Sequence, residues 1–429
     1  MRFEVLKRSN LKRNIVIGLL VVGIISAIIL NFTKAKYKNT ESIPLVNGTI
    51  NYIPYDLKMI AMYQEENGDY KEIEQMPEKG YSINEEKSYC MINNQKDKKV
   101  KLYTNDNGEH TISGLKKGSK CYLYFDKQQP LLAEAIIKDN IINTDTPNFG
   151  NAAIINEGIY KAEDNWGESF YFRGAVENNW IKFAGFYWRI IRINGDGSIR
   201  VIYNGTNTNV TGSNTMINSS QKFNSNNTRS EYAGYMYTSG QQHGNTTNSD
   251  IKTVLDKWYN SNLSSHANEI SKEAGFCGDR EMRTGYSWSS QPSGYSYYKA
   301  YERLGTDKVA DLKCSNISDL YTIHESTKGN HALTNPIGLI TADEISMAGG
   351  VYGQNNNNYY LYNNANYWTM TPASFSGYAN VFFIYEGGNL NIANWSVANT
   401  KTGVRPVINL DSNVTIKSGN GTSSTPYEI

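Results

Sequence analysis

Two adjacent carboxylates, Asp343 and Glu344, are the residues of this sequence whose types and spacing come nearest to a catalytic or metal-binding pair. They lie in the stretch PIGLITADEISMAGG, residues 336–350, between an apolar run and two glycines. A carboxylate pair can transfer protons or hold a metal ion. The stretch also has a structural interpretation, because Thr341 followed three residues later by Glu344 is the pattern of a helix capping box.

The structural interpretation gives a task to each residue of this stretch. The Thr341 hydroxyl accepts from the Glu344 amide, while the Glu344 carboxylate reaches back to the Thr341 amide. Asp343 is favoured in the first turn by the helix dipole, and Gly349 ends the helix. We therefore predict scaffolding, with catalysis and a calcium or ligand contact as the alternatives.

The histidines do not favour an enzyme. They are scattered and form no H-x-x-x-H, H-x-H or H-E-x-x-H pattern; they are His110, His243, His266, His324 and His331. His324 and His331 are the pair that a turn would bring together, which leaves a metal site as a minor alternative. The sequence also lacks a nucleophile elbow, a P-loop and a Rossmann fingerprint. We predict no catalytic residue, no metal and no cofactor.

Aromatic and asparagine residues crowd residues 354–400. One interpretation is that these aromatics form core, and the other is a contact surface. Trp395 stands beside Asn394 and Ser396 with no apolar alternation around it, and three tyrosines likewise neighbour Asn or Gly. We predict that Trp395 and at least one of these tyrosines are exposed on one shared face. The predicted ligand-binding residues are Trp395, Tyr359, Tyr360, Tyr378 and Asn394.

Four cysteines fall into two local pairs. Cys90 and Cys121 lie in one segment, and Cys277 and Cys314 lie in another, with no C-x-x-C motif. We predict the disulfides Cys90–Cys121 and Cys277–Cys314, which suit an oxidising compartment. Four unpaired buried thiols are the alternative.

The N-terminus carries the pattern of a membrane anchor. Residues 1–14 are basic and precede eighteen uncharged residues, 15–32, which would span about 27 Å as a helix. The excess of basic residues before the span favours a cytoplasmic tail and extracellular domains after it. A cleavable signal peptide is the alternative.

The rest of the chain reads as two domains of mainly short strands. Residues 45–140 predict a small β-sandwich-like domain, in which Cys121, Leu123 and Phe125 share one strand face. Residues 146–429 predict the outer domain. It opens with a hairpin around Asn194-Gly195-Asp196-Gly197, and its tract 204–250 predicts a long surface loop.

The outer domain also predicts a helix and further strands. Ile251, Val254, Leu255 and Trp258 have helical spacing, with Asn248 or Ser249 as the N-cap. Short strands follow toward the C-terminus, so we predict an α+β fold class.

The amino-acid composition limits the classes of partner that the protein is expected to bind. The net charge of +1 does not favour nucleic acid. The polar residues are mostly Asn, Ser, Thr and Gly, with 32 Tyr. An AT-rich genome and a ligand-binding surface are both sufficient causes of this richness.

Several motifs together resemble one family. The stretches FAGFYWRIIRINGDGSIRVIYNG, NPIGLITADEISMAGG, YWTMTP and GVRPVINL resemble an uncharacterised C-terminal domain of Gram-positive, membrane-anchored surface proteins. That domain is in turn similar to the C-type-lectin-like fold of formylglycine-generating enzymes. The resemblance covers about residues 146 to 411. It implies a compact, loop-rich α+β domain and fits the Cys277–Cys314 bridge.

The sequence departs from the enzymes of this fold. Those enzymes bind copper through a cysteine pair near the C-terminal end of the domain, whereas no cysteine follows Cys314 here. The calcium signatures of sugar-binding lectins, Glu-Pro-Asn and Trp-Asn-Asp, are also missing from the sequence. We therefore expect a single-pass surface protein whose outer domain binds an extracellular protein or glycan without catalysis. A structural envelope component is the alternative, and an enzyme on the lectin-like fold is a weaker one.

Overall fold

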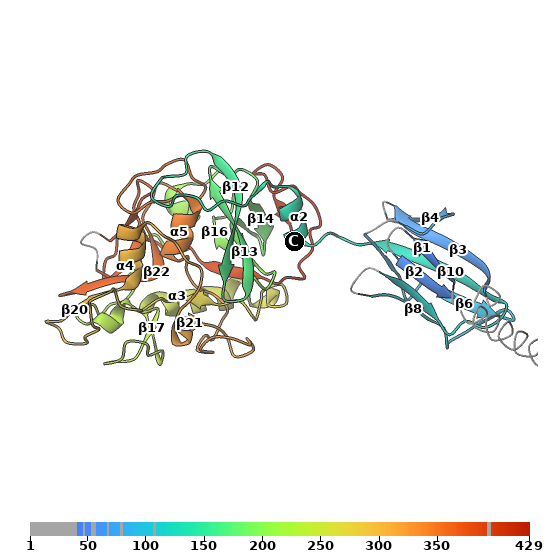
Figure 1. Ribbon diagram of the computed structural model, residues 1–429, viewed down its shortest axis with the longest axis horizontal. Coiled ribbons are helices and arrows are strands. Elements are labelled where there is room, and N and C mark those ends of the chain that lie inside the picture. Colours follow the sequence, from blue (N-terminus) through green and yellow to red (C-terminus); the bar gives the residue numbers. More distant parts are fainter. Residues whose placement is uncertain are drawn as a thin grey trace, which may run out of the picture. The chain divides into compact units, whose positions relative to one another are not determined.

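The structure is a computed structural model that describes residues 41–45, 48–52, 57–66, 68–77, 80–105, 109–392 and 396–429. The chain divides into two compact units, Met1–Gln129 and Pro130–Ile429 (Figure 1). The predicted tail 1–14 and anchor 15–32 lie outside the described residues.

The membrane assignment needs correction. In the described part of the chain no helix is long and apolar enough to cross a membrane. The longest helix there, α3, has 13 residues, whereas a span needs about 20. The described residues therefore give no support for the predicted transmembrane helix or for a single-pass membrane protein, and that assignment is withdrawn.

The first unit is built on a six-stranded sheet in the order β4-β3-β10-β6-β7, with β5 also paired to β10. Strand β10 alternates as predicted, with Cys121, Leu123 and Phe125 buried in the core. Cys90 on β6 stands directly opposite Cys121, and the two form a disulfide. The strands of this unit are β1 (Glu41–Leu45), β2 (Gly48–Tyr52), β3 (Leu57–Glu66), β4 (Asp69–Ile73), β5 (Tyr81–Ile83), β6 (Tyr89–Ile92), β7 (Gln95–Lys96), β8 (Lys101–Thr104), β9 (His110–Ser113) and β10 (Ser119–Lys127).

The second unit is built on an eight-stranded sheet in the order β11-β12-β13-β15-β14-β26, in which β16 joins β15 to β25. The predicted hairpin around Asn194-Gly195-Asp196-Gly197 is confirmed, because β15 and β16 pair antiparallel across it. The strands of this sheet are β11 (Ile142–Asn143), β12 (Asn156–Asp164), β13 (Gly167–Gly174), β14 (Trp180–Phe183), β15 (Phe186–Ile193), β16 (Ile199–Tyr203), β25 (Val407–Leu410) and β26 (Tyr427–Glu428).

Smaller sheets complete the second unit. A four-stranded sheet has the order β20-β22-β23-β24, and two-stranded sheets join β17 to β18 and β19 to β21. These strands are β17 (Met236–Tyr237), β18 (Thr247–Asn248), β19 (Phe276–Cys277), β20 (Tyr295–Tyr297), β21 (Leu320–Tyr321), β22 (Tyr367–Ser376), β23 (Ala379–Ile384) and β24 (Leu390–Asn391).

In the described part of the chain, the helices are few and short. The predicted amphipathic helix is confirmed as α3, which Ser249 caps and which buries Ile251 and Leu255. The α-helices are α2 (Leu132–Lys138), α3 (Asp250–Asn262), α4 (Lys299–Glu302) and α5 (Ala342–Ala348). A π-helical turn follows at η4 (Arg303–Asp307), and 3-10 turns are η1 (Gly212–Thr215), η2 (Ser230–Ala233), η3 (Ser264–His266) and η5 (Ile317–Asp319).

The predicted α+β class is wrong. Among the described residues, strands hold 35% and helices 14%, so this part of the chain is mainly β. The predicted fold class combined a transmembrane helix, a β-sandwich-like domain and a C-type-lectin-like domain. It is replaced by a mainly β architecture. The error arose because local patterns locate individual helices, but they do not show how much of the intervening chain pairs as strand.

The tract 204–250 is also not a surface loop. Its residues Phe223, Tyr235 and Met236 are buried in the main core. Its backbone pairs with the C-terminal region, for example through Ile217 N to Val404 O at 3.0 Å. The tract looked like a loop because its apolar residues are widely spaced, although each one is buried or partly buried.

The central sheet has one apolar face and one face that carries arginines. A bulge in β15 between Ile190 and Arg192 keeps Arg192 opposite Arg200 and Arg189 opposite Ile202. Cross-strand partners point to the same side, so Arg189, Arg192 and Arg200 share one face. All three side chains are buried. A buried guanidinium needs acceptors, and this requirement shapes the site described below.

Candidate functional site

The carboxylate pair of the sequence lies at the start of α5. The predicted capping box is confirmed: Thr341 Oγ1 accepts from Glu344 N at 3.1 Å, and Glu344 Oε2 accepts from Thr341 N at 2.9 Å. Every residue of α5 is buried. Gly349 ends the helix in the left-handed conformation, as predicted.

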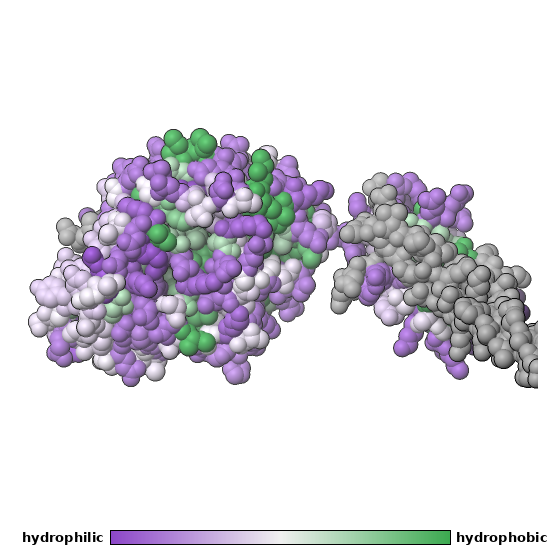
Figure 2. Space-filling model, in the orientation of Figure 1, coloured by the Kyte–Doolittle hydropathy of each residue, from purple (hydrophilic) through white to green (hydrophobic). Residues whose placement is uncertain are grey.

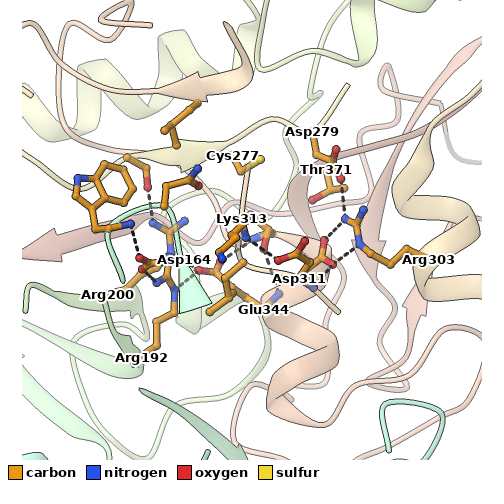
Figure 3. A pocket seen from close by; sticks show the side chains of 17 residues that line it. Asp164, Arg192, Arg200, Cys277, Asp279, Arg303, Asp311, Lys313, Glu344 and Thr371 are labelled. Carbon is orange, nitrogen blue, oxygen red and sulfur yellow. Dashed lines mark hydrogen bonds and ion pairs between the residues drawn. The ribbon is translucent and has the colours of Figure 1, made fainter. Parts of the chain in front are cut away.

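Glu344 also joins two arginines of the central sheet (Figure 3). Its Oε1 lies 3.0 Å from Arg192 Nε and 2.5 Å from Arg200 Nε. Arg192 in turn donates to Asp164 Oδ2 at 2.5 Å. These four side chains are at most 7% exposed. Two carboxylates and two guanidiniums thus neutralise one another inside the protein.

Asp343 belongs to a second cluster with Arg303 and Asp279. Figure 3 shows these two partners on the other side of the same pocket from Arg192 and Arg200. Arg303 donates two hydrogen bonds of 2.8 Å to the Asp343 carboxylate, one from Nε and one from a terminal nitrogen. The same terminal nitrogen reaches Asp279 at 2.6 Å. The Asp311 amide also donates to Asp343 at 3.0 Å. Each carboxylate of the Asp-Glu pair therefore has its own arginine partners.

A fourth arginine holds the other end of α5. Arg173, on β13, donates to the carbonyl oxygens of Ser346 and Met347 at 3.0 Å each. It also pairs with Glu157 at 2.9 Å. A cation at the last carbonyls of a helix satisfies acceptors that have no partner within the helix. Both ends of α5 are thus attached to the arginine-bearing face of the sheet, and Figure 1 shows the helix beside β13.

The charges around Glu344 set its protonation. Burial by itself raises the pKa of the Glu344 carboxyl, but Arg200 and Arg192 outweigh burial and hold that pKa below its ordinary value. Burial and the nearby Asp343 raise the pKa of Asp279, against the opposing effect of Arg303. A carboxylate that is ionised and held by two guanidiniums is a poor proton acceptor, so Glu344 is not suited to general-base work.

The pocket between these clusters is small. Its volume is about 30 Å³, which is comparable to the share of one water molecule in the liquid. Among the described residues, no group of three or more His, Cys, Asp and Glu is placed to hold a metal ion. The arrangement can neutralise charge and fix α5, but it leaves no room for an organic substrate.

The second predicted disulfide lines this pocket. Cys277 on β19 bonds to Cys314, with their Cα atoms 5.4 Å apart, so both predicted pairings are confirmed. The backbone of Cys314 exchanges two hydrogen bonds with the Asn165 side chain, of 2.7 and 3.2 Å. The disulfide therefore links the segment before Cys314, which also lines the pocket, to β19.

Three of the histidines make specific contacts in the second unit. His324 and His331 do approach each other, with ring centroids 6.5 Å apart, and His331 Nδ1 lies 3.2 Å from the Ile323 carbonyl. His243 lies 3.0 Å from Asp319, which also binds Arg280. The sequence predicts His243 to lie in a surface loop and gives no sign of its contact with Asp319.

Three of the predicted ligand-binding residues, Tyr359, Tyr360 and Tyr378, lie in the described part of the chain. Trp395 and Asn394 lie outside the described residues. Tyr359 and Tyr360 are only 3% and 6% exposed, so neither is the exposed tyrosine that the prediction requires. The physical reason is that their rings pack into the main core, where the Tyr360 ring stacks 5.3 Å from the buried Arg189 guanidinium. Tyr378 is 37% exposed, at the turn between β22 and β23.

A different group of tyrosines lies at the surface. Tyr286, Tyr297, Tyr301 and Tyr352 form a chain of ring contacts, with successive centroids 4.8, 6.2 and 5.8 Å apart. The Arg283 guanidinium lies 5.6 Å from the Tyr286 ring and 5.9 Å from the Tyr301 ring.

Strand β20 adds an exposed edge to this group. Tyr295 is 62% exposed and shares a strand face with Tyr297, two residues further on. We call Arg283, Tyr286, Tyr295, Tyr297, Tyr301 and Tyr352 the tyrosine face. The surface around β20, at the lower left of Figure 2, is pale and thus of intermediate hydropathy.

The sequence did not predict the buried arginines of the central sheet or the tyrosine face, although a sequence pattern accompanies each group. Arg189 and Arg192 stand within the apolar run of β15, where a charged side chain must be buried and therefore paired. The stretch GYSYYKAY, residues 294–301, concentrates tyrosines among glycine and serine. Comparison with known proteins finds no matching family model, no matching curated protein and no matching solved structure.

Proposed function

We propose that this chain is a non-catalytic binding protein of an oxidising, extracytoplasmic compartment, and that the tyrosine face is its contact surface. The observation that carries the proposal is the cluster of partly exposed tyrosines around Arg283. Tyrosine and arginine are enriched at the energetic centres of protein interfaces. Tyrosine also offers a large contact area at a small entropic cost.

The surrounding structure supports a preformed contact surface. The Tyr352 ring contacts the buried Phe382 at 6.2 Å, which ties the tyrosine face to the core. Strand β20 is hydrogen-bonded to β22, so Tyr295 and Tyr297 stand on a sheet rather than on a free loop. Side chains that are already ordered lose less entropy when a partner binds.

Two further observations support the other parts of the proposal. The two disulfides suit a compartment in which thiols are oxidised. Asp343 and Glu344, the pair that first suggested catalysis, are held in ion pairs around a pocket of about 30 Å³. The chemistry of the tyrosine face favours a protein partner, and a glycan is the outcome that the experiment must also allow.

The test uses the full chain, probed against a panel of immobilised extracellular-matrix proteins and against a glycan array. For any partner found, Tyr286→Ala and Tyr295→Ala are expected to cost about 2 kcal/mol or more of affinity, roughly a thirty-fold rise in Kd. Tyr103→Ala is the matched control, because Tyr103 is 39% exposed in the first unit. Equal binding by the folded variants and the wild type would overturn the proposed surface.

A further inference from the structure

Lys252 is a buried lysine that the proposed function does not use. Its side chain is 1% exposed, although lysine is almost never fully buried unless it is paired. Its partner is Asp256, one helical turn further along α3, with Lys252 Nζ 2.6 Å from Asp256 Oδ2. Burial distinguishes this pair from the solvated i,i+4 pairs that are common on helix surfaces.

The second oxygen of the same carboxylate holds a carboxamide. Asp256 Oδ1 accepts from Asn335 Nδ2 at 3.2 Å, across 79 residues of sequence. Asn335 is also buried. One carboxylate therefore bridges an amine and a carboxamide, both of which are shielded from water.

The core holds both ends of this arrangement in place. On α3, the neighbouring Ile251 and Leu255 are buried, and Ser249 caps the helix. On the other side, the Ile337 amide donates to the Asn335 carbonyl at 2.8 Å, and the buried Tyr235 hydroxyl donates to the Ile337 carbonyl at 3.0 Å. Reacting groups that are held as neighbours react as if at a very high concentration.

We propose that Lys252 and Asn335 form an intramolecular amide bond, with Asp256 as the proton carrier. The Lys252 and Asp256 side chains are 1% and 15% exposed, so both charges lose much of their solvation, and proton transfer from Lys252 to Asp256 removes both charges. The amine Nζ that results is a nucleophile, and the carboxamide carbon Cγ of Asn335 is its electrophile.

The bond changes balance without an added reactant. The Nζ lone pair forms a bond to Asn335 Cγ, and the carbonyl π electrons move onto Oδ1. When the carbonyl re-forms, the bond from Cγ to Nδ2 breaks. Nδ2 collects the proton on Asp256 and the one further proton released by Nζ, and it leaves as ammonium. The products are a Lys252–Asn335 amide, an ionised Asp256 and one ammonium ion, so atoms and charge are conserved.

The experiment is mass spectrometry of the purified, folded full chain after reduction of its disulfides. The wild type is expected to weigh less than its sequence by the mass of one ammonia molecule. Proteolysis is expected to yield one branched peptide that joins the segments around residues 252 and 335. Asp256→Asn, which preserves shape but removes the proton carrier, and Lys252→Met are expected to keep the full mass and to yield no branched peptide.

The control is Lys257→Met, because Lys257 is an exposed lysine of the same helix. That variant is expected to retain the mass loss and the branched peptide. Wild-type protein with its full mass and two separate peptides would overturn the proposal, whether or not the variants fold. Simple deamidation of Asn335 raises the mass instead of lowering it, so it would also count against the amide bond.

Discussion

Replacing Glu344 by glutamine tests whether the buried network stabilises the second unit. The change removes one charge from a carboxylate that lies 3.0 Å from Arg192 and 2.5 Å from Arg200. Arg192 keeps Asp164 at 2.5 Å. For Arg200, the remaining hydrogen-bond acceptors among the described residues are neutral, namely Gly275 O at 3.1 Å, Asn409 Oδ1 at 3.3 Å and Leu339 O at 3.4 Å.

The expected cost follows from the charge that is left behind. Removing one partner of a buried ion pair typically destabilises a protein by about 3–5 kcal/mol, because the other charge stays buried without compensation. We expect Glu344→Gln to lower the free energy of unfolding by about that amount. The loss exceeds what the cap alone explains, since losing an N-cap side chain costs about 1 kcal/mol.

Urea unfolding followed by tryptophan fluorescence is the suitable assay. All 7 tryptophans lie at or beyond position 166, so fluorescence reports on the second unit alone. Glu428→Gln is the matched control, because its carboxylate pairs with Lys182 at 2.7 Å on an exposed surface. If Glu344→Gln unfolds at the same urea concentration as Glu428→Gln, the reasoning about the buried network is refuted.

Four further predictions use the same measurement. The destabilisation by Glu344→Gln should shrink as the pH falls below about 4.5, the ordinary pKa of this carboxyl: its folded pKa is lowered, so its contribution is present above the unfolded value and is lost in acid. A constant difference down to acidic pH would contradict this assignment. Thr341→Ala should cost about 1 kcal/mol and leave any ligand binding unchanged; lost binding with unchanged stability would revive an active-site role. Cys277→Ser with Cys314→Ser should cost about 3–4 kcal/mol for a loop of 37 residues. Cys90→Ser with Cys121→Ser should leave the fluorescence transition in place, and a shift there would show that the two units unfold together.

Several elements could be predicted because their causes are local. The alternation of Cys121, Leu123 and Phe125 has the period of a strand, and α3 has the period of a helix. The capping box and the hairpin turn each span four residues, so each is complete within a short window of sequence. The disulfide pairs also followed from segment membership, because each pair closes a loop of fewer than forty residues.

The partners of these elements could not be predicted in the same way. The sequence places Glu344 at a helix start, but it does not show that Arg192, 152 residues away, binds the same carboxylate. Tyr359 and Tyr360 stand beside asparagines like exposed residues, yet they are buried because the core encloses them. The tract 204–250 has the composition of a loop, and it pairs with residues near Val404.

The sequence by itself thus determined where the capped helix α5, the β15–β16 hairpin and the disulfides occur. Only the tertiary structure decided that the carboxylates of α5 meet buried arginines and that the surface tyrosines gather around Arg283 instead of around Tyr359 and Tyr360. The physical reason is that periodicity, caps and turns act between near neighbours in the chain. Burial and charge pairing depend on which strands lie side by side, and that order is set by contacts over the whole unit.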